Sequence, residues 1–169
     1  MTATRLPFLE RLALPLIAAP MLRVSGLQLV RAACANGVIG SFPTANCRDA
    51  DELDAWLARL RRDADEARER GAVVAPFCPN LVMRRDAALL ERDIACIVRH
   101  RTELVITSVG SPAAVVPALH DHGCLVLADV ASMEHAEKAL RAGADGLVLL
   151  TAGAGGQTGW ANPFAFVRA

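Results

Sequence analysis

One stretch decides the fold: residues 143–159 read GADGLVLLTAGAGGQTG. The glycine at position 143 is typical of a helix end, and the apolar run Gly146–Leu150 is typical of a strand buried on both faces. A loop with four glycines in seven residues follows, from Gly153 to Gly159. The backbone N–H groups of such a loop can close on an anion. The stretch therefore predicts a β/α unit that ends in a phosphate-binding loop, and a flexible turn is the alternative.

The same unit recurs towards the N-terminus. Five more short apolar runs precede this stretch, and most do not alternate with polar residues, as is usual for strands of a parallel sheet. These predicted strands are Leu14–Ala19, Val38–Ser41, Val73–Ala75, Leu104–Ser108 and Cys124–Ala128. Amphipathic segments lie between them. A capping box is predicted at Ser25, and Ser111 and Ser132 are predicted to be helix N-caps. These predicted helices are Ser25–Ala35, Asp49–Arg70, Asp86–His100, Ser111–Asp121 and Ser132–Gly143, and a sixth begins at Asn162.

Two architectures contain repeated β/α units, the doubly wound open sheet and the (β/α)8 barrel. No G-x-G-x-x-G motif follows the first strand, and polar, Gly and Pro residues follow nearly every strand. Both observations favour the barrel, which gathers its strand ends on one catalytic face. We therefore predict an α/β fold of the TIM-barrel type with six strands and five to six helices. Because a whole barrel takes roughly 250 residues, we expect residues 1–169 to be the N-terminal part of one barrel domain that lacks its last two β/α units.

Composition excludes several classes of function. Lys plus Arg and Asp plus Glu both number 18, and aromatic residues make up 4%, so neither nucleic acid nor a membrane surface is an expected partner. The apolar run near the N-terminus is interrupted by Pro15 and Pro20, which argues against a signal peptide or a membrane span. The five cysteines form no C-x-x-C motif. They indicate buried free thiols, a cytoplasmic protein and no metal site.

Two further strand ends carry candidate site residues. Pro20 and Met21 follow the first strand, where Met21 could pack on a flat cofactor ring or simply in the core. The segment Pro76–Asn80 is predicted to be a stiff loop that presents Asn80, whose amide offers both a donor and an acceptor. A turn-forming asparagine is an equally good interpretation.

The four histidines fall on predicted helices or helix ends. His120 and His122 precede Gly123 at a helix C-terminus, which predicts surface positions on the face of a barrel remote from the chemistry. His135 lies in the first turn of its helix and is the one histidine expected on the active-site side.

Five motifs in order along the chain carry a resemblance. They are PLIAAPM at 15–21, ANGVIG at 35–40, FCPNL at 77–81, GADGLV at 143–148 and GAGGQTG at 153–159. The chain resembles the nitronate monooxygenase family, which are FMN enzymes on a (β/α)8 barrel. Flavin-type enoyl-acyl-carrier-protein reductases share most of these motifs, and inosine-monophosphate dehydrogenases share the barrel and the GADG segment.

The resemblance implies FMN as cofactor and assigns roles to individual residues. Ala19, Pro20 and Met21 are expected along the flavin ring, and Asn80 is expected to hydrogen-bond it. The remaining cofactor-binding residues implied are Asp129, which would contact the ring system, and Gly155 and Gly156, which would hold the phosphate.

One departure concerns the catalytic position. Gln157 stands where the family usually has a histidine, and a neutral amide cannot act as a general base. A nitronate is already an anion, so Gln157 could serve by donating a hydrogen bond to its nitro oxygens. A neutral nitroalkane would need a base. Asp129 is the only carboxylate at a predicted strand end, and a flavin contact or a structural role suits it equally well.

These observations predict an FMN-dependent oxidoreductase that oxidises alkyl nitronates, or similar small anions, with O2. A flavin-dependent enoyl reductase that uses NAD(P)H is one alternative. A non-catalytic FMN- or phosphate-binding module is another. The chain alone is expected to bind FMN weakly and to be inactive, and an oligomer is compatible with the sequence.

Overall fold

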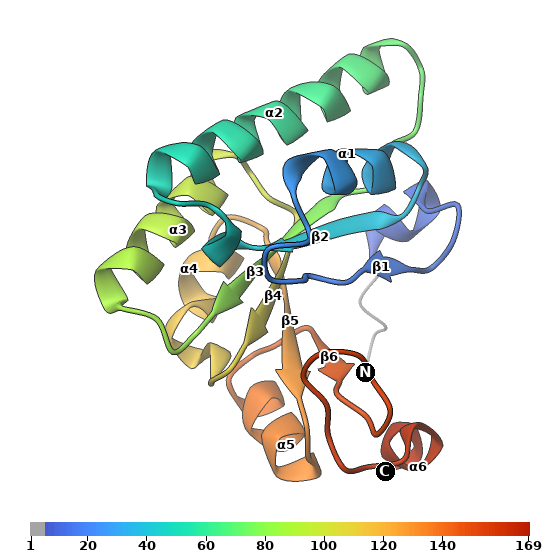
Figure 1. Ribbon diagram of the computed structural model, residues 1–169, viewed down its shortest axis with the longest axis vertical. Helices are drawn as coiled ribbons and strands as arrows, with labels where there is room; N and C mark the ends of the chain where they lie inside the picture. Colours follow the sequence, from blue (N-terminus) through green and yellow to red (C-terminus); the bar gives the residue numbers. More distant parts are fainter. Residues whose placement is uncertain (1–5) are drawn as a thin grey trace.

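The computed structural model describes residues 6–169, and its centre is a sheet of six parallel strands (Figure 1). The strands are β1 Ile17–Ala18, β2 Ile39–Pro43, β3 Phe77–Val82, β4 Leu104–Ser108, β5 Leu125–Val130 and β6 Gly146–Leu149. Their order in the sheet is the order of the sequence. A doubly wound sheet reverses its strand order at a switch point. The sequential order confirms the prediction of an incomplete barrel of the TIM type.

Helices follow the strands and pack on the outer face of the curved sheet. They are α1 Leu27–Ala35, α2 Ala50–Glu69, α3 Ala87–Arg99, α4 Val116–His120, α5 Met133–Arg141 and α6 Pro163–Arg168. Three short 3-10 helices complete the structure, η1 Pro7–Arg11, η2 Thr44–Asn46 and η3 Pro112–Ala114. Side chains of Asp49, Asp86, Ser132 and Asn162 cap α2, α3, α5 and α6, and the cap at Ser132 is the one predicted from the sequence.

Alternate residues of each strand face two different apolar layers. The outward layer joins strand residues such as Phe42 and Val126 to helix residues such as Leu57. The inward layer joins Ile39, Cys78, Leu104 and Ile106 to Phe8 of η1. Because apolar layers cover both faces of the sheet, the strands consist mostly of consecutive apolar residues. All five cysteines are buried free thiols, as predicted.

Two predicted strands are placed differently in the structure. The third strand is Phe77–Val82 instead of Val73–Ala75, so the predicted loop at Pro76–Asn80 is largely strand. Pro79 pairs with Phe42 of β2, and a proline in a strand removes only a single ladder donor. The first strand is limited to Ile17–Ala18, because the chain before it, around Pro15, is exposed and irregular.

The start of α1 also differs from the predicted capping box at Ser25. The helix begins at Leu27 with Gly26 as its N-cap, and no side chain caps it. The Ser25 hydroxyl instead bonds backbone atoms of the preceding loop. Similarly, Ser111 caps η3, and α4 is confined to Val116–His120.

Within residues 6–169, no helix combines the length and the apolarity needed to cross a membrane. The same residues contain no group of three or more His, Cys, Asp or Glu side chains that could hold a metal ion.

Candidate active site

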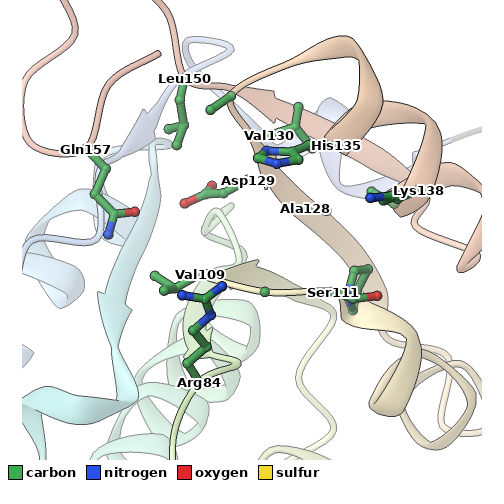
Figure 2. Close-up of a pocket in the computed structure, with 14 residues that line it drawn as sticks. Arg84, Val109, Ser111, Ala128, Asp129, Val130, His135, Lys138, Leu150 and Gln157 are labelled. Carbon is green, nitrogen blue, oxygen red and sulfur yellow. The ribbon is translucent and has the colours of Figure 1, made fainter.

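A cavity of about 350 Å³ opens at the carboxyl ends of β4, β5 and β6 (Figure 2). Asp129 of β5 and Gln157 of the loop after β6 line it from two sides. His135 enters from α5, and Arg84 enters from the loop after β3. The structure therefore brings both sequence-predicted catalytic candidates, Asp129 and Gln157, to one cavity.

Asp129 lies on the inward side of β5, because its neighbours Ala128 and Val130 belong to an outer apolar cluster. Its carboxylate points towards Gln157 in Figure 2. Among residues 6–169 it has no hydrogen bond and no ion pair. Burial disfavours the charged form and raises the pKa of Asp129 from 3.8 to about 6. The cavity thus contains a half-buried carboxylate that has no partner among the described residues and a pKa raised by burial.

The glycine loop is closed at its base. The backbone N–H of Ala152 donates to the carbonyl of Ala161 at 2.9 Å, and the Thr158 hydroxyl donates to the carbonyl of Thr151 at 2.5 Å. Gly159 is buried against Leu150, and a Cβ at Gly159 would come within 2.1 Å of the Leu150 carbonyl oxygen. The first residues of the loop are therefore packed tightly against its last residues.

The tip of the same loop is open. A Cβ at Gly155 or Gly156 would meet no atom within 4 Å. Among the described residues, the backbone N–H groups of these two glycines have no acceptor. Exposed N–H groups without protein acceptors suit an anion such as a phosphate. The tip is continuous with Gln157, so an anion held there would border the cavity.

A second loop, Ala19–Ser25 after β1, is held by side chains. The Ser25 hydroxyl donates to the carbonyl of Ala19 at 2.9 Å and accepts from the N–H of Met21 at 3.0 Å. Asn46 of η2 donates to the carbonyls of Met21 and Ser25 at 3.1 and 3.0 Å and accepts from the N–H of Arg23 at 2.7 Å. With the backbone fixed in this way, the Met21 side chain remains 41% exposed.

Asn80 lies within β3 and is only 5% exposed. Its amide nitrogen donates to the carbonyl of Ile106 at 3.3 Å and to the hydroxyl of Ser108 at 3.0 Å. The side-chain oxygen accepts from the Ser108 hydroxyl at 3.3 Å, so both polar atoms of the amide have partners inside the sheet. The prediction that a loop presents Asn80 is wrong, because the strand extends through it.

The cavity lining, as far as residues 6–169 define it, includes neither Ala19–Met21 nor Asn80. Sequence reasoning missed several lining residues, among them Arg84, Val109 and Lys138. Arg84 follows a strand whose position was predicted wrongly, and Lys138 has the signature of a solvated helix residue, with its amine on Glu134 at 2.6 Å. The positive φ of Val109, 56°, has no sequence signal.

The histidines lie where the sequence places them. His120 bonds Asp145 at 2.9 Å and His122 bonds the carbonyl of Ala118 at 2.9 Å, both near the end of α4. His135 lies on the cavity side, as predicted.

Comparison with known proteins decides the family. The sequence profile of the nitronate monooxygenases matches residues 5–166. The chain belongs to the nitronate monooxygenase family. The resemblance inferred from five short motifs is thereby confirmed. No protein with a curated description matches the sequence.

Solved structures resemble this nitronate monooxygenase family member in fold. FabK from Thermotoga maritima has a TM-score of 0.78 at 23% identity, over 95% of this chain and 48% of FabK. An M276A mutant of the same protein has a TM-score of 0.79 at 22% identity, over 95% of this chain and 50% of the mutant. Nitroalkane oxidase from Streptomyces ansochromogenes has a TM-score of 0.72 at 22% identity, over 94% and 53%. The chain spans about half the length of these proteins.

Proposed function

We propose that the protein is an FMN-dependent oxidoreductase of the nitronate monooxygenase type, which oxidises alkyl nitronates with O2. Membership of the family supports this reaction. The observation that carries the proposal is that Asp129 and Gln157 line one cavity at the strand ends, and that the open glycine tip directly precedes Gln157 in the chain. In barrels of this type the catalytic site lies on that face.

The residues present fit a flavin. The free N–H groups of Gly155 and Gly156 suit its phosphate, and the half-exposed Met21 beside Ala19 and Pro20 offers an apolar edge for the ring. When bound, the flavin would take electrons from the substrate and pass them to O2. The side-chain oxygen of Asn80 accepts from Ser108, and its second lone pair could accept a hydrogen bond from the ring.

In this reaction the role of Gln157 is to bind the substrate nitronate. Its amide donates hydrogen bonds and carries no charge, so it can hold the two oxygens of a nitronate without competing for a proton. Arg84 lines the same cavity and has no ion pair among residues 6–169. Its positive charge favours a small anionic substrate over a neutral one.

The test uses protein expressed from the complete reading frame. We expect yellow protein that releases FMN on denaturation and consumes O2 when an alkyl nitronate is added. Gln157→Ala should raise the KM for nitronate by about tenfold, the effect of losing one or two hydrogen bonds to a charged group. Colourless protein without releasable flavin contradicts the proposal.

A flavin-dependent enoyl reductase that uses NAD(P)H is the second candidate, and the structural likeness to FabK favours it. Anaerobic mixing separates the two: NAD(P)H would bleach the flavin of a reductase, whereas nitronate would leave it oxidised. Tight FMN binding with neither reaction would support the third candidate, a non-catalytic module.

We also propose that this chain is the N-terminal part of a longer barrel domain in the cytoplasm. Within residues 6–169, β1 and β6 each pair with one neighbour only, and the chain spans half the length of proteins of like fold. Two further β/α units would pair with these edges. The five free thiols support a reducing compartment. The mass of the native protein tests the first point.

A further inference from the structure

A largely buried ion pair involves the residue that follows Arg84 in the chain. The carboxylate of Asp93, on α3, is 6% exposed and lies 2.8 Å from the guanidinium of Arg85. Arg85 also donates to the hydroxyl of Thr44 at 3.1 Å, and this hydroxyl donates to the Asp93 carboxylate. Thr44 is the first residue of η2 and is buried. The three side chains therefore join η2, the turn after β3 and α3.

Stability alone does not account for this ion pair. Removing a carboxylate from water costs free energy that a single buried ion pair often fails to return. Burial raises the pKa of Asp93 although Arg85 and Thr44 both stabilise its charged form, so desolvation outweighs these two partners. Apolar side chains of similar size would fill the same space without that cost. A directional, charged pair instead imposes one geometry on the elements that it joins.

Arg84 lies between two anchored residues. On one side, the N–H of Met83 donates to the carbonyl of Ser108 at 2.8 Å. Gly110 packs so closely on Met83 that a Cβ at Gly110 would lie 2.8 Å from the Met83 Cβ. On the other side, Arg85 is held by the ion pair. With both neighbours fixed, the Arg84 side chain extends into the cavity (Figure 2), and it has no ion pair among residues 6–169.

We propose that Asp93 is a positioning residue for substrate binding, because through Arg85 it holds the turn after β3 in the conformation that directs Arg84 into the cavity. This inference rests on the proposed function, in which Arg84 favours an anionic substrate. Asp93 acts from a distance, since the cavity lining that residues 6–169 form does not include it. The physical basis is preorganisation: a cation that is already fixed at its site loses little conformational freedom when the anion binds.

Asp93→Asn separates the ion pair from the packing of η2. An asparagine at position 93 still offers an oxygen to the Thr44 hydroxyl, but it lacks the charge that holds the Arg85 guanidinium. The position of η2 should therefore persist, and with it the bonds from Asn46 to the loop after β1. The substitution should affect the substrate through Arg84 and leave the flavin loop in place.

A double-mutant cycle tests the proposal in flavin-loaded protein from the complete reading frame. Asp93→Asn should raise the KM for an alkyl nitronate by about tenfold, the effect of losing one hydrogen bond to a charged group. The kcat and the FMN affinity should stay unchanged, because the lost contact is made equally before and during the reaction. Arg84→Gln should raise KM at least as much. In the Arg84→Gln background, Asp93→Asn should have no further effect on KM, because its effect passes through Arg84.

Hydrogen exchange followed by mass spectrometry gives a readout that needs neither flavin nor turnover. In the flavin-free protein, the amide of Met83, which donates to Ser108, should exchange about tenfold faster in Asp93→Asn than in the wild type, since the turn opens more easily. Asp63→Asn is the matched control. Asp63, on α2, pairs with Arg31 of α1 outside the cavity lining, and its loss should change neither KM nor the exchange at Met83.

The outcomes separate this inference from the proposed function. A wild type that oxidises nitronate while Asp93→Asn keeps the wild-type KM overturns only the role of Asp93. A rise in KM that adds fully to that of Arg84→Gln overturns it as well, and so does a loss of kcat in both backgrounds, which is the mark of a general structural fault. Unchanged exchange at Met83 overturns it even where no nitronate is oxidised. If Asp93→Asn does not fold, Arg85→Lys, which keeps the charge and loses the planar fork, is judged by the same criteria.

Discussion

Gly159 approaches the carbonyl oxygen of Leu150 so closely that a Cβ at position 159 would lie 2.1 Å from it. The Ala131 carbonyl, 3.1 Å from the same point, closes the other side. Gly159 therefore packs the glycine loop against the residue that follows β6 and against the turn after β5. Leu150 also lines the cavity, so the contact sets the position of Gln157 relative to Asp129.

Gly159→Ala should displace the loop and weaken FMN binding by at least about tenfold, because a side chain cannot fit against backbone without moving it. Titration of the flavin-free complete protein with FMN measures the effect. Gly26→Ala is the matched control, since a Cβ at Gly26 meets nothing within 4 Å. Equal FMN affinity in Gly159→Ala and the wild type would contradict this account of the loop.

Asp129→Asn should stabilise the protein at pH 7. The folded state raises the pKa of Asp129 from 3.8 to about 6, so it binds the proton more tightly than the unfolded state does. The wild type therefore loses stability as the pH rises from about 4 to about 6. The variant should gain about 2 kcal/mol at pH 7, somewhat less than the full shift implies because the side chain is partly exposed.

Urea denaturation of both proteins from pH 3.5 to 8 measures this difference. The two free energies of unfolding should converge below pH 4, where Asp129 is protonated in both states. A difference that does not change with pH would mean that the substitution acts through packing instead of charge.

Val109→Gly should raise the free energy of unfolding by about 1 kcal/mol. Val109 has a φ of 56°, and a β-branched residue in the left-handed region carries strain of about 1–3 kcal/mol. The flexibility of glycine in the unfolded state offsets part of the relief. Val73→Gly, at an exposed position without a positive φ, is the comparison and should be slightly destabilising. Chemical denaturation at pH 7 tests the pair.

Asn46→Ala should release the loop after β1. The substitution removes three hydrogen bonds to the backbone of Met21, Arg23 and Ser25, each of which contributes about 1 kcal/mol. FMN affinity should fall by about tenfold through the loss of an ordered apolar edge. Asn36→Ala removes a single bond to Ala32 within α1 and should leave the affinity unchanged. An equal effect of the two substitutions would contradict a positioning role for Asn46.

The alternation of β and α elements could be predicted from the sequence because each unit carries its own local signals. Solid apolar runs indicate buried strands, and Asp49, Asp86 and Ser132 mark helix starts through bonds to nearby backbone. The third strand was misplaced because Pro76 and Pro79 resemble loop residues. Pro79 is accommodated because β3 pairs with β2 in a register that places it opposite Phe42. That register depends on tertiary contacts between the two strands, which the local sequence does not show.

The residues of the candidate site also fall into two groups, those that the sequence identifies and those whose place depends on tertiary structure. Asp129 could be found because it follows a predicted strand, and strand ends share one face. Gln157 was found through the family resemblance, as the residue at the usual histidine position. Arg84 and Lys138 could not, since their place in the cavity depends on how the loop after β3 and helix α5 fold over the sheet. The role of Ser25 was misread, because its hydroxyl binds the loop before it rather than the helix after it.

The sequential strand order has a consequence for biosynthesis. Each strand from β2 onwards pairs in parallel with the strand one unit earlier in the chain. A ribosome releases the chain from its N-terminus, and domains fold as their parts emerge. Every new β/α unit thus finds its partner already in place and never has to wait for a later one. The sheet can grow one strand at a time, so its exposed edges are β1 and the newest strand, and no interior strand waits unpaired.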